Sequence, residues 1–468
     1  MDAAQRNGII RTIFFAVILS FFLMFTIHAV LEIPTQHRIA VGQELRIPLN
    51  YPKELLDSIK VHINSQNANV IKYKGINTKN IAFNPNDSWP VAANPGTVKL
   101  QVKLFGLIPL KNMIVDVLPQ YEVIPGGQSI GVILKSHGII VVGYSSIKVS
   151  GESLVPAKSA GIRVGDVILS INGRKADSEE AVAEIVDSAG RERKNVVMRV
   201  KRGKHVMNLN VKPVYCSETG RYRIGLYVRD NAAGVGTLTF YEPKSNIFGA
   251  LGHAVSSGNS DQEVAFKSGK IIEATVQGIH QGKRGQPGEK IGIFLNDGRV
   301  KGNIINNSKY GIFGKMTQFS DENSFYRKPI PVAFSGQIKE GPAKMLTVVQ
   351  GDNVEAFDIK ILKVMPNQHN SGRGLVIKVT DKKLINLTGG IIQGMSGSPI
   401  IQNGRLVGAV THVFINDPTQ GYGVMAEWML LESGILDGEE ISRKVGVEFP
   451  GYFSFFIDFS KNFCYFCL

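Results

Sequence analysis

The stretch that decides the fold is GMSGSP, residues 394–399, inside the apolar run GGIIQGMSGSPIIQNGRLVGAVTHV, residues 389–413. Glycine weakens a strand, but it reaches backbone angles and close contacts that other residues do not tolerate. Glycines on both sides of Ser396 therefore predict an exposed nucleophile or a tight bend. Ser398 is the alternative nucleophile, but Pro399 after it restricts its backbone to extended geometry. We therefore favour Ser396.

A nucleophilic serine needs a base, a group that orients the base, and N–H donors for the developing oxyanion. The glycine bend lets the amides of Gly394 and Ser396 face one side, which predicts an oxyanion hole. Among nine histidines, His253 in FGALGHAVS has small neighbours that leave space for an imidazole. His412, on the strand after the serine hairpin, is the alternative base.

Composition indicates a globular, mainly β protein. The 468 residues suffice for two to four domains, 43% are hydrophobic and 20% charged, and 50 glycines with 20 prolines predict many turns. The net charge of +14 comes without zinc-finger spacing, an RNP pattern or a basic helix, so we expect no nucleic-acid partner. Cys464 and Cys467 form a CxxC at the chain end without a βαβ setting, which predicts neither metal nor redox cofactor.

The first residues predict a membrane anchor. Arg6 and Arg11 precede an apolar stretch, residues 13–31, that is long enough to cross a bilayer and has no clear cleavage site after it. Residues 1–31 are therefore expected to be a signal anchor that leaves the bulk of the chain outside the cytoplasm. A cleaved signal is the alternative. Residues 32–120 alternate short apolar runs with turns and are expected to form a β-rich spacer domain.

Residues 121–214 predict a compact mixed unit. The run PAKSAGIRVGDVILSINGRK at 156–175 contains the hairpin signal Asn172-Gly173. A helix follows at 178–190, with Ser178 as its cap, apolar residues at i, i+3, i+4 and i+7, and Gly190 to close it.

This segment resembles the PDZ domains attached to bacterial proteases. Such domains offer backbone amides to a peptide carboxylate and accept the ligand as an extra strand. The resemblance assigns the loop to Ile130, Gly131 and Val132 and the strand to 132–135. Its implied partner is a peptide or a protein C-terminus.

The segment 215–446 has many short strands punctuated by glycine, which predicts paired β-barrels. The serine motif, the Asn403-Gly404 hairpin and the upstream Gly-His-Ala resemble the chymotrypsin-like serine peptidases. Residues 447–468 are rich in phenylalanine but interrupted by Pro450, Asp458 and Lys461. We assign this tail no role.

The whole arrangement is similar to the stage IV sporulation protein B peptidases of endospore-forming bacteria. FGALGHA, GMSGSPIIQNG and GAVTHVFINDPTQGYG carry this resemblance. It implies a single-pass endopeptidase of the cytoplasmic membrane, facing the space between forespore and mother cell. Such enzymes cleave themselves and then a membrane-bound regulator of an intramembrane metalloprotease, which activates processing of a sigma factor precursor.

The resemblance places the orienting acid on Asp381, fifteen residues before Ser396. The residues themselves leave alternatives, because Asp381 also suits a turn and other acids fit the chain order. These are Asp297, Asp321, Asp352 and Asp358.

Two other functions are compatible with the pattern. One is a catalytically inactive, membrane-tethered PDZ scaffold, for which the SSGNSD stretch after His253 and the displaced acid would be marks of decay. The other is a general envelope-quality serine protease that cleaves many unfolded proteins.

Overall fold

A computed structural model describes residues 35–435, except 48, 50–52, 66, 150, 204, 256–265, 295–299, 318 and 320–321. The chain divides into two compact units. Within the described residues, the first contains 35–121 together with Pro331–Lys339, and the second contains Glu122–Ile330 and 340–435. The expected anchor, the SSGNSD stretch and the aromatic tail lie outside the described residues. Across the described ranges, no helix combines the length and the apolar character that a membrane crossing requires.

The first unit is a small β domain. Its five-stranded sheet has the order β1-β8-β7-β2-β5, and β3, β4 and β6 form a second sheet. Val98, Leu100 and Val102 are buried on one face, as their alternation predicts. The bounds are β1 (Gln36–Ala40), α2 (Lys53–Leu56), β2 (Ile59–Ser65), β3 (Ile71–Tyr73), β4 (Ile76–Thr78), β5 (Asn80–Phe83), β6 (Val91–Ala92), β7 (Gly96–Leu104), β8 (Ile108–Leu118) and η1 (Ser335–Gln337).

The second unit contains two β-barrels, as the glycine-punctuated strands predict. In the first barrel, β10 pairs with β21 on one edge and with β19 on the other, so the ring β10-β21-β23-β24-β20-β19 closes on itself. The bounds are β9 (Glu122–Pro125), β10 (Ser129–Tyr144), β19 (Leu226–Glu242), β20 (Ile247–Ala250), β21 (Phe266–His280), β22 (Glu289–Phe294), β23 (Val300–Ser308), β24 (Gly311–Met316) and β25 (Ile330–Pro331).

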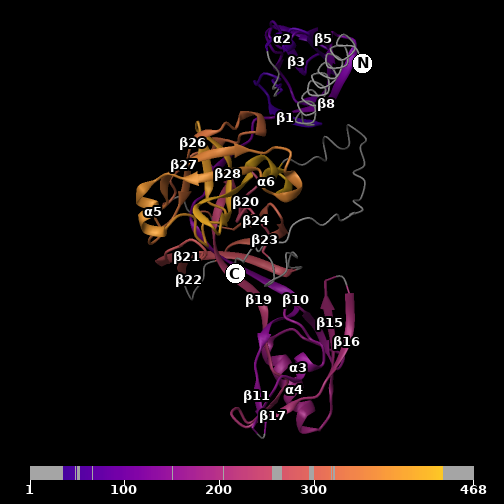
Figure 1. The fold of residues 1–468 in the computed structure, drawn as a ribbon, viewed down its shortest axis with the longest axis vertical. Helices are drawn as coiled ribbons and strands as arrows, with labels where there is room; N and C mark the ends of the chain where they lie inside the picture. Colours follow the sequence, from indigo (N-terminus) through magenta and orange to yellow (C-terminus); the bar gives the residue numbers. More distant parts are fainter. Residues whose placement is uncertain are drawn as a thin grey trace, which may run out of the picture. The chain divides into compact units, whose positions relative to one another are not determined.

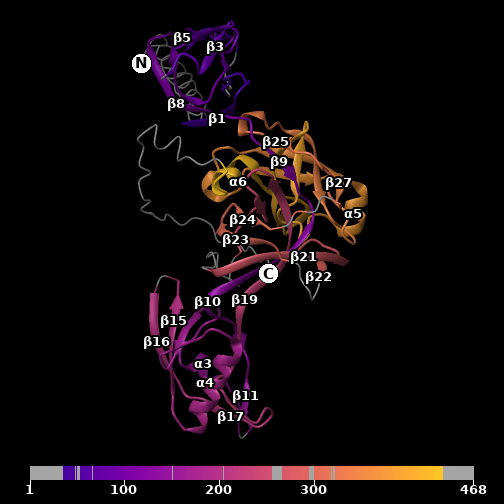
Figure 2. The ribbon, with the colours of Figure 1, turned by 180° about the vertical axis from the view of Figure 1, so that it is seen from behind.

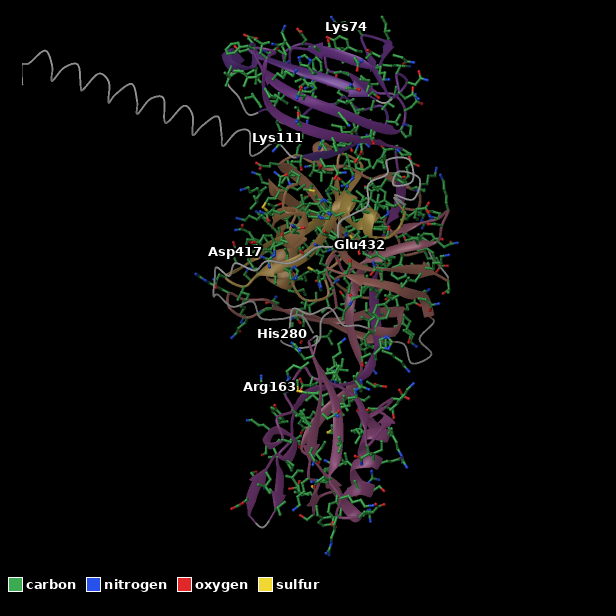
Figure 3. The ribbon with its side chains drawn as sticks, turned by 90° about the vertical axis from the view of Figure 1, so that its right-hand side faces the viewer. Lys74, Lys111, Arg163, His280, Asp417 and Glu432 are labelled. Carbon is green, nitrogen blue, oxygen red and sulfur yellow. The ribbon has the colours of Figure 1, made fainter. Side chains whose placement is uncertain are left out.

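The second barrel closes in the order β26-β27-β28-β31-β30-β29, and Figure 1 shows β26, β27 and β28 side by side. Glu432, labelled in Figure 3, accepts a hydrogen bond of 3.0 Å from Asn306 of β23, which ties α6 to the first barrel. The bounds are β26 (Gly341–Thr347), β27 (Glu355–Val364), η2 (His369–Ser371), β28 (Leu375–Val379), α5 (Lys382–Thr388), β29 (Pro399–Gln402), β30 (Arg405–Phe414), β31 (Asp417–Met425) and α6 (Ala426–Glu432).

The PDZ-like elements are inserted between β10 and β19, which lie side by side and run on into the first barrel (Figure 2). Their own core includes Ile139, Ile168, Val186 and Val200. The bounds are β11 (Ile147–Val149), β12 (Glu152–Leu154), α3 (Pro156–Ser159), β13 (Val167–Ile171), β14 (Arg174–Lys175), α4 (Glu179–Arg191), β15 (Val196–Arg202), β16 (His205–Val211), β17 (Val214–Cys216) and β18 (Arg221–Arg223).

Two sequence-based boundaries need correction. The segment expected to open the PDZ unit at 121 instead supplies β9 and the first half of β10 to the first barrel. Within the expected peptidase segment, Pro331–Lys339 packs with the small β domain. A strand of alternating or apolar residues carries no local mark of the sheet that it will join, because its partners are distant in sequence.

Local features were predicted more accurately. Asn172 and Gly173 have φ of 49° and 77°, and Asn403 and Gly404 have φ of 50° and 71°, as tight hairpins require. Ser178 caps α4 by accepting a hydrogen bond from the Ala181 amide.

Gly190 does not close α4. It lies inside the helix, where a Cβ would stand 2.3 Å from the side chain of Tyr222. Its role is therefore close packing rather than termination.

Candidate active site

Ser396 and His253 line one cavity of about 370 Å³ in the second unit. Ser396 lies on the loop between α5 and β29, and His253 follows β20 of the first barrel. Folding thus brings together two residues that are 143 positions apart. The apolar part of the lining consists of Val132, Ala233, Val235, Leu251, Ala254, Val255, Ile291 and Phe294.

The serine loop is fastened to β19 through its carbonyl groups. Thr237 donates through Oγ1 to the Gly394 carbonyl at 2.7 Å, and Thr239 donates to the Gly397 carbonyl at 2.7 Å. The Thr237 amide also donates to the Ser396 carbonyl at 2.9 Å. Both threonines are fully buried. Because these hydrogen bonds are buried away from water, breaking them is costly, and they hold the bend in place.

The amides of Gly394 and Ser396, the predicted oxyanion donors, have no main-chain acceptor among the described residues. In a trans peptide the N–H points opposite to the preceding carbonyl. The carbonyl before Gly394 accepts from the Lys290 amide, and the carbonyl of Met395 accepts from Ser398. Within the described chain neither amide donates to a main-chain carbonyl, whereas the amides of Met395, Gly397 and Ser398 do. The two amides are therefore available to an oxyanion.

The Ser396 hydroxyl donates to the Thr411 carbonyl at 2.9 Å. Its proton is therefore not directed at His253 in this arrangement, and proton transfer requires rotation about the Cα–Cβ bond into the shared cavity. Ser398 is fully buried and does not line the cavity, and its hydroxyl has no partner among the described residues. The geometry thus favours Ser396 over Ser398 as nucleophile.

His253 presents the ring nitrogen that a base needs. Its Nδ1 lies 2.8 Å from the Ala254 carbonyl. Because a carbonyl only accepts hydrogen bonds, Nδ1 carries the hydrogen and Nε2 keeps its lone pair. Nε2 is buried and has no partner in the described part of the chain. Burial lowers the pKa of His253 below its ordinary value, which favours the neutral, basic form.

The Ala254 carbonyl is a functional group that the sequence reasoning missed. It fixes the tautomer of the imidazole, a task that the resemblance gives to an aspartate. No residue pattern marks such a group, since every residue has a carbonyl. Only the fold shows which one meets the ring.

His412, the alternative base, lies against His253 with ring centroids 4.9 Å apart. Desolvation, together with His253 and Arg373 nearby, lowers the pKa of His412. The His412 side chain also keeps an exposed surface. His412 does not line the cavity that contains Ser396, whereas His253 does. This favours His253 as base and leaves His412 as its neighbour.

Asp381 is engaged elsewhere. Its carboxylate caps α5 by accepting from the Leu384 amide at 3.0 Å, and it also accepts from the Asp358 amide at 3.3 Å. Among the described residues no hydrogen bond joins Asp381 to His253, and Asp381 does not line the Ser396 cavity. The structure therefore brings Ser396 and His253 together but not the expected acid. The orienting role of Asp381 stays a prediction.

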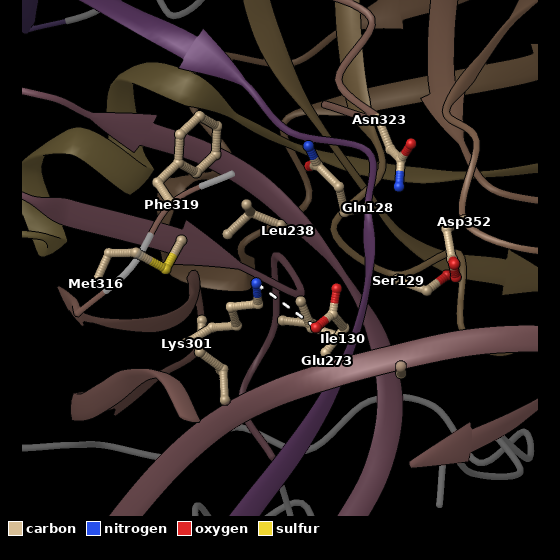
Figure 4. A pocket seen from close by; sticks show the side chains of 12 residues that line it. Gln128, Ser129, Ile130, Leu238, Glu273, Lys301, Met316, Phe319, Asn323 and Asp352 are labelled. Carbon is tan, nitrogen blue, oxygen red and sulfur yellow. Dashed lines mark ion pairs between the residues drawn. The ribbon is translucent and has the colours of Figure 1, made fainter. Parts of the chain in front are cut away.

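The other candidate acids either do not line this cavity or lie outside the described residues. Asp358 forms an exposed ion pair with Lys344 at 2.8 Å. Asp352 lines a different, smaller cavity of about 80 Å³, shown in Figure 4, beside Ser129. That cavity contains the Glu273–Lys301 pair, 3.6 Å apart. Asp297 and Asp321 lie outside the described residues.

The prediction that Ile130, Gly131 and Val132 form a peptide-binding loop is wrong. Ile130, Gly131 and Val132 lie on β10 inside the first barrel, and Gly131 pairs with Val235 on one side and Ile272 on the other. Both edges are already used, so this segment cannot accept a ligand strand. Gly131 is required because a Cβ would meet the Phe294 ring at 2.5 Å.

The PDZ insertion has another groove. A cavity of about 630 Å³ lies between α4 and residues 221–228. Residues 226–228 pair with β10 on one edge, and no described strand covers the other. Gly225 precedes them with a φ of 77°, and the groove contains Arg221 and Arg223. The sequence RIGLYV at 223–228 is a short signal that the reasoning did not use.

No three His, Cys, Asp or Glu side chains in the described ranges gather closely enough to hold a metal ion. A double β-barrel that places a serine, a histidine and two amides without a main-chain acceptor around one cavity has the arrangement of a serine endopeptidase. The chemistry open to such an arrangement is acyl transfer, in which a serine attacks a peptide carbonyl, an imidazole takes its proton, and amides bind the oxyanion.

Comparison with known families gives the particular assignment. Residues 220–430 match the SpoIVB peptidase S55 family, and residues 155–202 match the PDZ domain. Over these residues the chain is therefore similar to the SpoIVB peptidase family, as its motifs predict. None of the curated proteins matches the chain.

The solved structures that are similar to parts of this chain include a PDZ domain and a protease. The PDZ domain of the SdrC-like protein Lmo2051 from Listeria monocytogenes is 23% identical over 20% of this chain and 87% of that one, with a TM-score of 0.16. The active form of the Rv3671c protease from M. tuberculosis is 17% identical over 43% of this chain and 75% of that one, with a TM-score of 0.25. Its inactive form is 15% identical over 43% and 84%, also with a TM-score of 0.25.

Proposed function

We propose that this serine endopeptidase acts in sporulation signalling: it cleaves itself and then a membrane-bound regulator, which activates processing of a sigma factor precursor. Residues 1–31 would tether it to the cytoplasmic membrane, with its bulk between forespore and mother cell. The observation that carries the peptidase chemistry is the cavity shared by Ser396 and His253, with the Gly394 and Ser396 amides alongside. The family resemblance supports the pathway.

The nucleophile is tested with a fluorophosphonate probe on the purified full chain. Wild type should be labelled and should cleave itself, whereas Ser396→Ala should do neither and should keep the wild-type thermal midpoint. Ser398→Ala serves as the matched control and should be labelled normally. Continued self-cleavage by Ser396→Ala, with host proteases excluded, would reject Ser396 as nucleophile.

Specificity for a membrane-bound regulator is tested by co-expressing the peptidase with membrane-bound substrate proteins. The same peptidase preparation is also incubated with unfolded casein. Cleavage of one or two membrane proteins, with casein intact, supports the signalling role. Broad cleavage of casein would instead support an envelope-quality protease.

We also propose that the PDZ groove between α4 and residues 226–228 binds an extended peptide or a protein C-terminus. The uncovered strand edge supplies main-chain hydrogen-bonding groups, and Arg221 and Arg223 supply positive charge for a carboxylate. Arg223→Glu should weaken binding of peptides with a free carboxylate while sparing their amidated forms. An equal loss for both forms would reject carboxylate capture.

A further inference from the structure

Lys290 is a buried lysine inside the active-site cavity that the proposed mechanism does not use. It lies on β22, and only 5% of its surface is exposed. Its Nζ donates to Thr347 Oγ1 of β26 at 2.8 Å, and Thr347 is fully buried. No ion pair joins Lys290 to a carboxylate among the described residues. An ammonium with so few partners is costly to bury.

Lys290 contacts the loop that carries the Gly394 amide through both its main chain and its side chain. Its amide donates to the Gln393 carbonyl at 2.9 Å, which turns the Gly394 N–H in the opposite direction. Its side chain packs on Gly394, where a Cβ would lie 3.1 Å from Lys290 Cβ and Cδ. The main-chain bond therefore sets the direction of the Gly394 N–H, and the packed lysine side chain limits how far Gly394 can move.

The hydrogen bond to Thr347 connects this loop to the second barrel. β22 pairs with β21 of the first barrel, whereas Thr347 ends β26 of the second. The Lys290 side chain thus spans from one barrel to the other while resting on Gly394. Small movements of an oxyanion donor change rates strongly, because the donor must meet the charge where it develops.

Resting on the proposed peptidase function, we propose that Lys290 is a positioning residue of the reaction. It holds the Gly394 amide in the oxyanion hole through its contacts with Gln393, Gly394 and Thr347. A purely structural side chain at this place would be better served by an apolar residue of similar length, because no charge would then be desolvated. An action on the site explains why a lysine, and not an apolar residue, occupies this place.

The electrostatics of the cavity support this assignment. Desolvation lowers the pKa of Lys290 to about 7. Ionisable neighbours are few: Glu289 and His253 also line the cavity, and His280 pairs with Glu289 on β21. On β26, Lys344 is exposed and pairs with Asp358. Lys290 therefore loses its charge at a much lower pH than an exposed lysine does.

The test measures inactivation of the full-length chain by the fluorophosphonate at saturating and limiting probe, which separates the maximal rate from the apparent affinity. Lys290→Met should lower the maximal rate about tenfold or more and change the affinity by less than about twofold. Its thermal midpoint should equal or exceed that of wild type, because a buried charge is removed. Lys360→Met, on an exposed lysine of β27, is the control and should match wild type.

Variants of Thr347 make the test specific. Thr347→Val removes the hydrogen-bond acceptor of Lys290 and should slow the maximal rate, whereas Thr347→Ser keeps a hydroxyl and should restore it. The double variant Lys290→Met with Thr347→Val should be no slower than Lys290→Met alone.

Between pH 6 and 9, the maximal rate of wild type should change near pH 7 in a step that Lys290→Met lacks. A wild-type rate in Lys290→Met, or a slow rate with a lowered thermal midpoint, would overturn the positioning role. Failure of wild type to label would instead overturn the peptidase proposal itself.

Discussion

Replacing Gly397 by alanine should disable the site by displacing the serine loop. Gly397 has a φ of 92°, and a Cβ there would lie 2.1 Å from the Thr237 carbonyl oxygen and 2.4 Å from the Leu251 nitrogen. Both atoms belong to main chain that is held in the first barrel, so the loop must retreat instead. Contact between carbon and oxygen requires more than about 3 Å, which implies a shift of about 1 Å.

The expected magnitude follows from that displacement. A misplacement of about 1 Å at a reacting group costs about 100-fold in rate, or about 2.7 kcal/mol of transition-state stabilisation. The positive φ adds about 1–2 kcal/mol of backbone strain to the folded state. Gly397→Ala should therefore label with fluorophosphonate about 100-fold more slowly and should also unfold at a lower temperature.

Gly404→Ala is the matched control. Gly404 has a comparable φ of 71°, but nothing lies within 4 Å of its added Cβ. It should show the backbone strain without the displacement, so its stability falls while its labelling rate is unchanged. If folded Gly397→Ala labels as fast as Gly404→Ala, the inference that the loop is pinned against the first barrel is wrong.

The remaining predictions use the same purified chain. Thr237→Val leaves a buried carbonyl of the serine loop unpaired and should cost about 1–3 kcal/mol in the free energy of unfolding; denaturant titration checks this, and no loss would contradict the fastening of the loop. Because burial lowers the pKa of His253, the neutral base persists as pH falls, and the acid limb of labelling should have its midpoint below the ordinary histidine value of about 6.5; a midpoint above it would contradict a buried neutral base. Asp381→Asn should retain a helix cap and hence stability, so a large fall in labelling would identify it as the orienting acid, and an unchanged rate would confine it to capping. Asp166 is 1% exposed and binds Arg202 through two bonds of 2.7 Å, so Asp166→Asn should destabilise the PDZ insertion by about 3 kcal/mol in calorimetry; an unshifted transition would show that the pair contributes little.

Sequence reasoning located the groups whose role depends on their immediate neighbours. Glycines around Ser396, the two Asn-Gly turns and the capped helix at Ser178 are local conformational signals, so they can be identified from a few adjacent residues. His253 could be selected for its small neighbours, because space around an imidazole is also a local property. The double barrel followed from the spacing of strands and turns.

Other features depended on partners far along the chain. Ile130–Val132 has the pattern of a PDZ loop but lies between two strands of the first barrel, because pairing with β19 and β21 buries its apolar residues. Asp381 suited both a cap and a triad, and the fold placed it at α5.

Sequence alone therefore determined which residue types are available for the reaction and where the chain bends. Only the tertiary structure decided that the Ala254 carbonyl meets the imidazole, and that Lys290 supports the Gly394 amide. The physical reason is that bends are set by short-range backbone sterics, whereas a catalytic site is set by which strands find each other and by what their pairing buries.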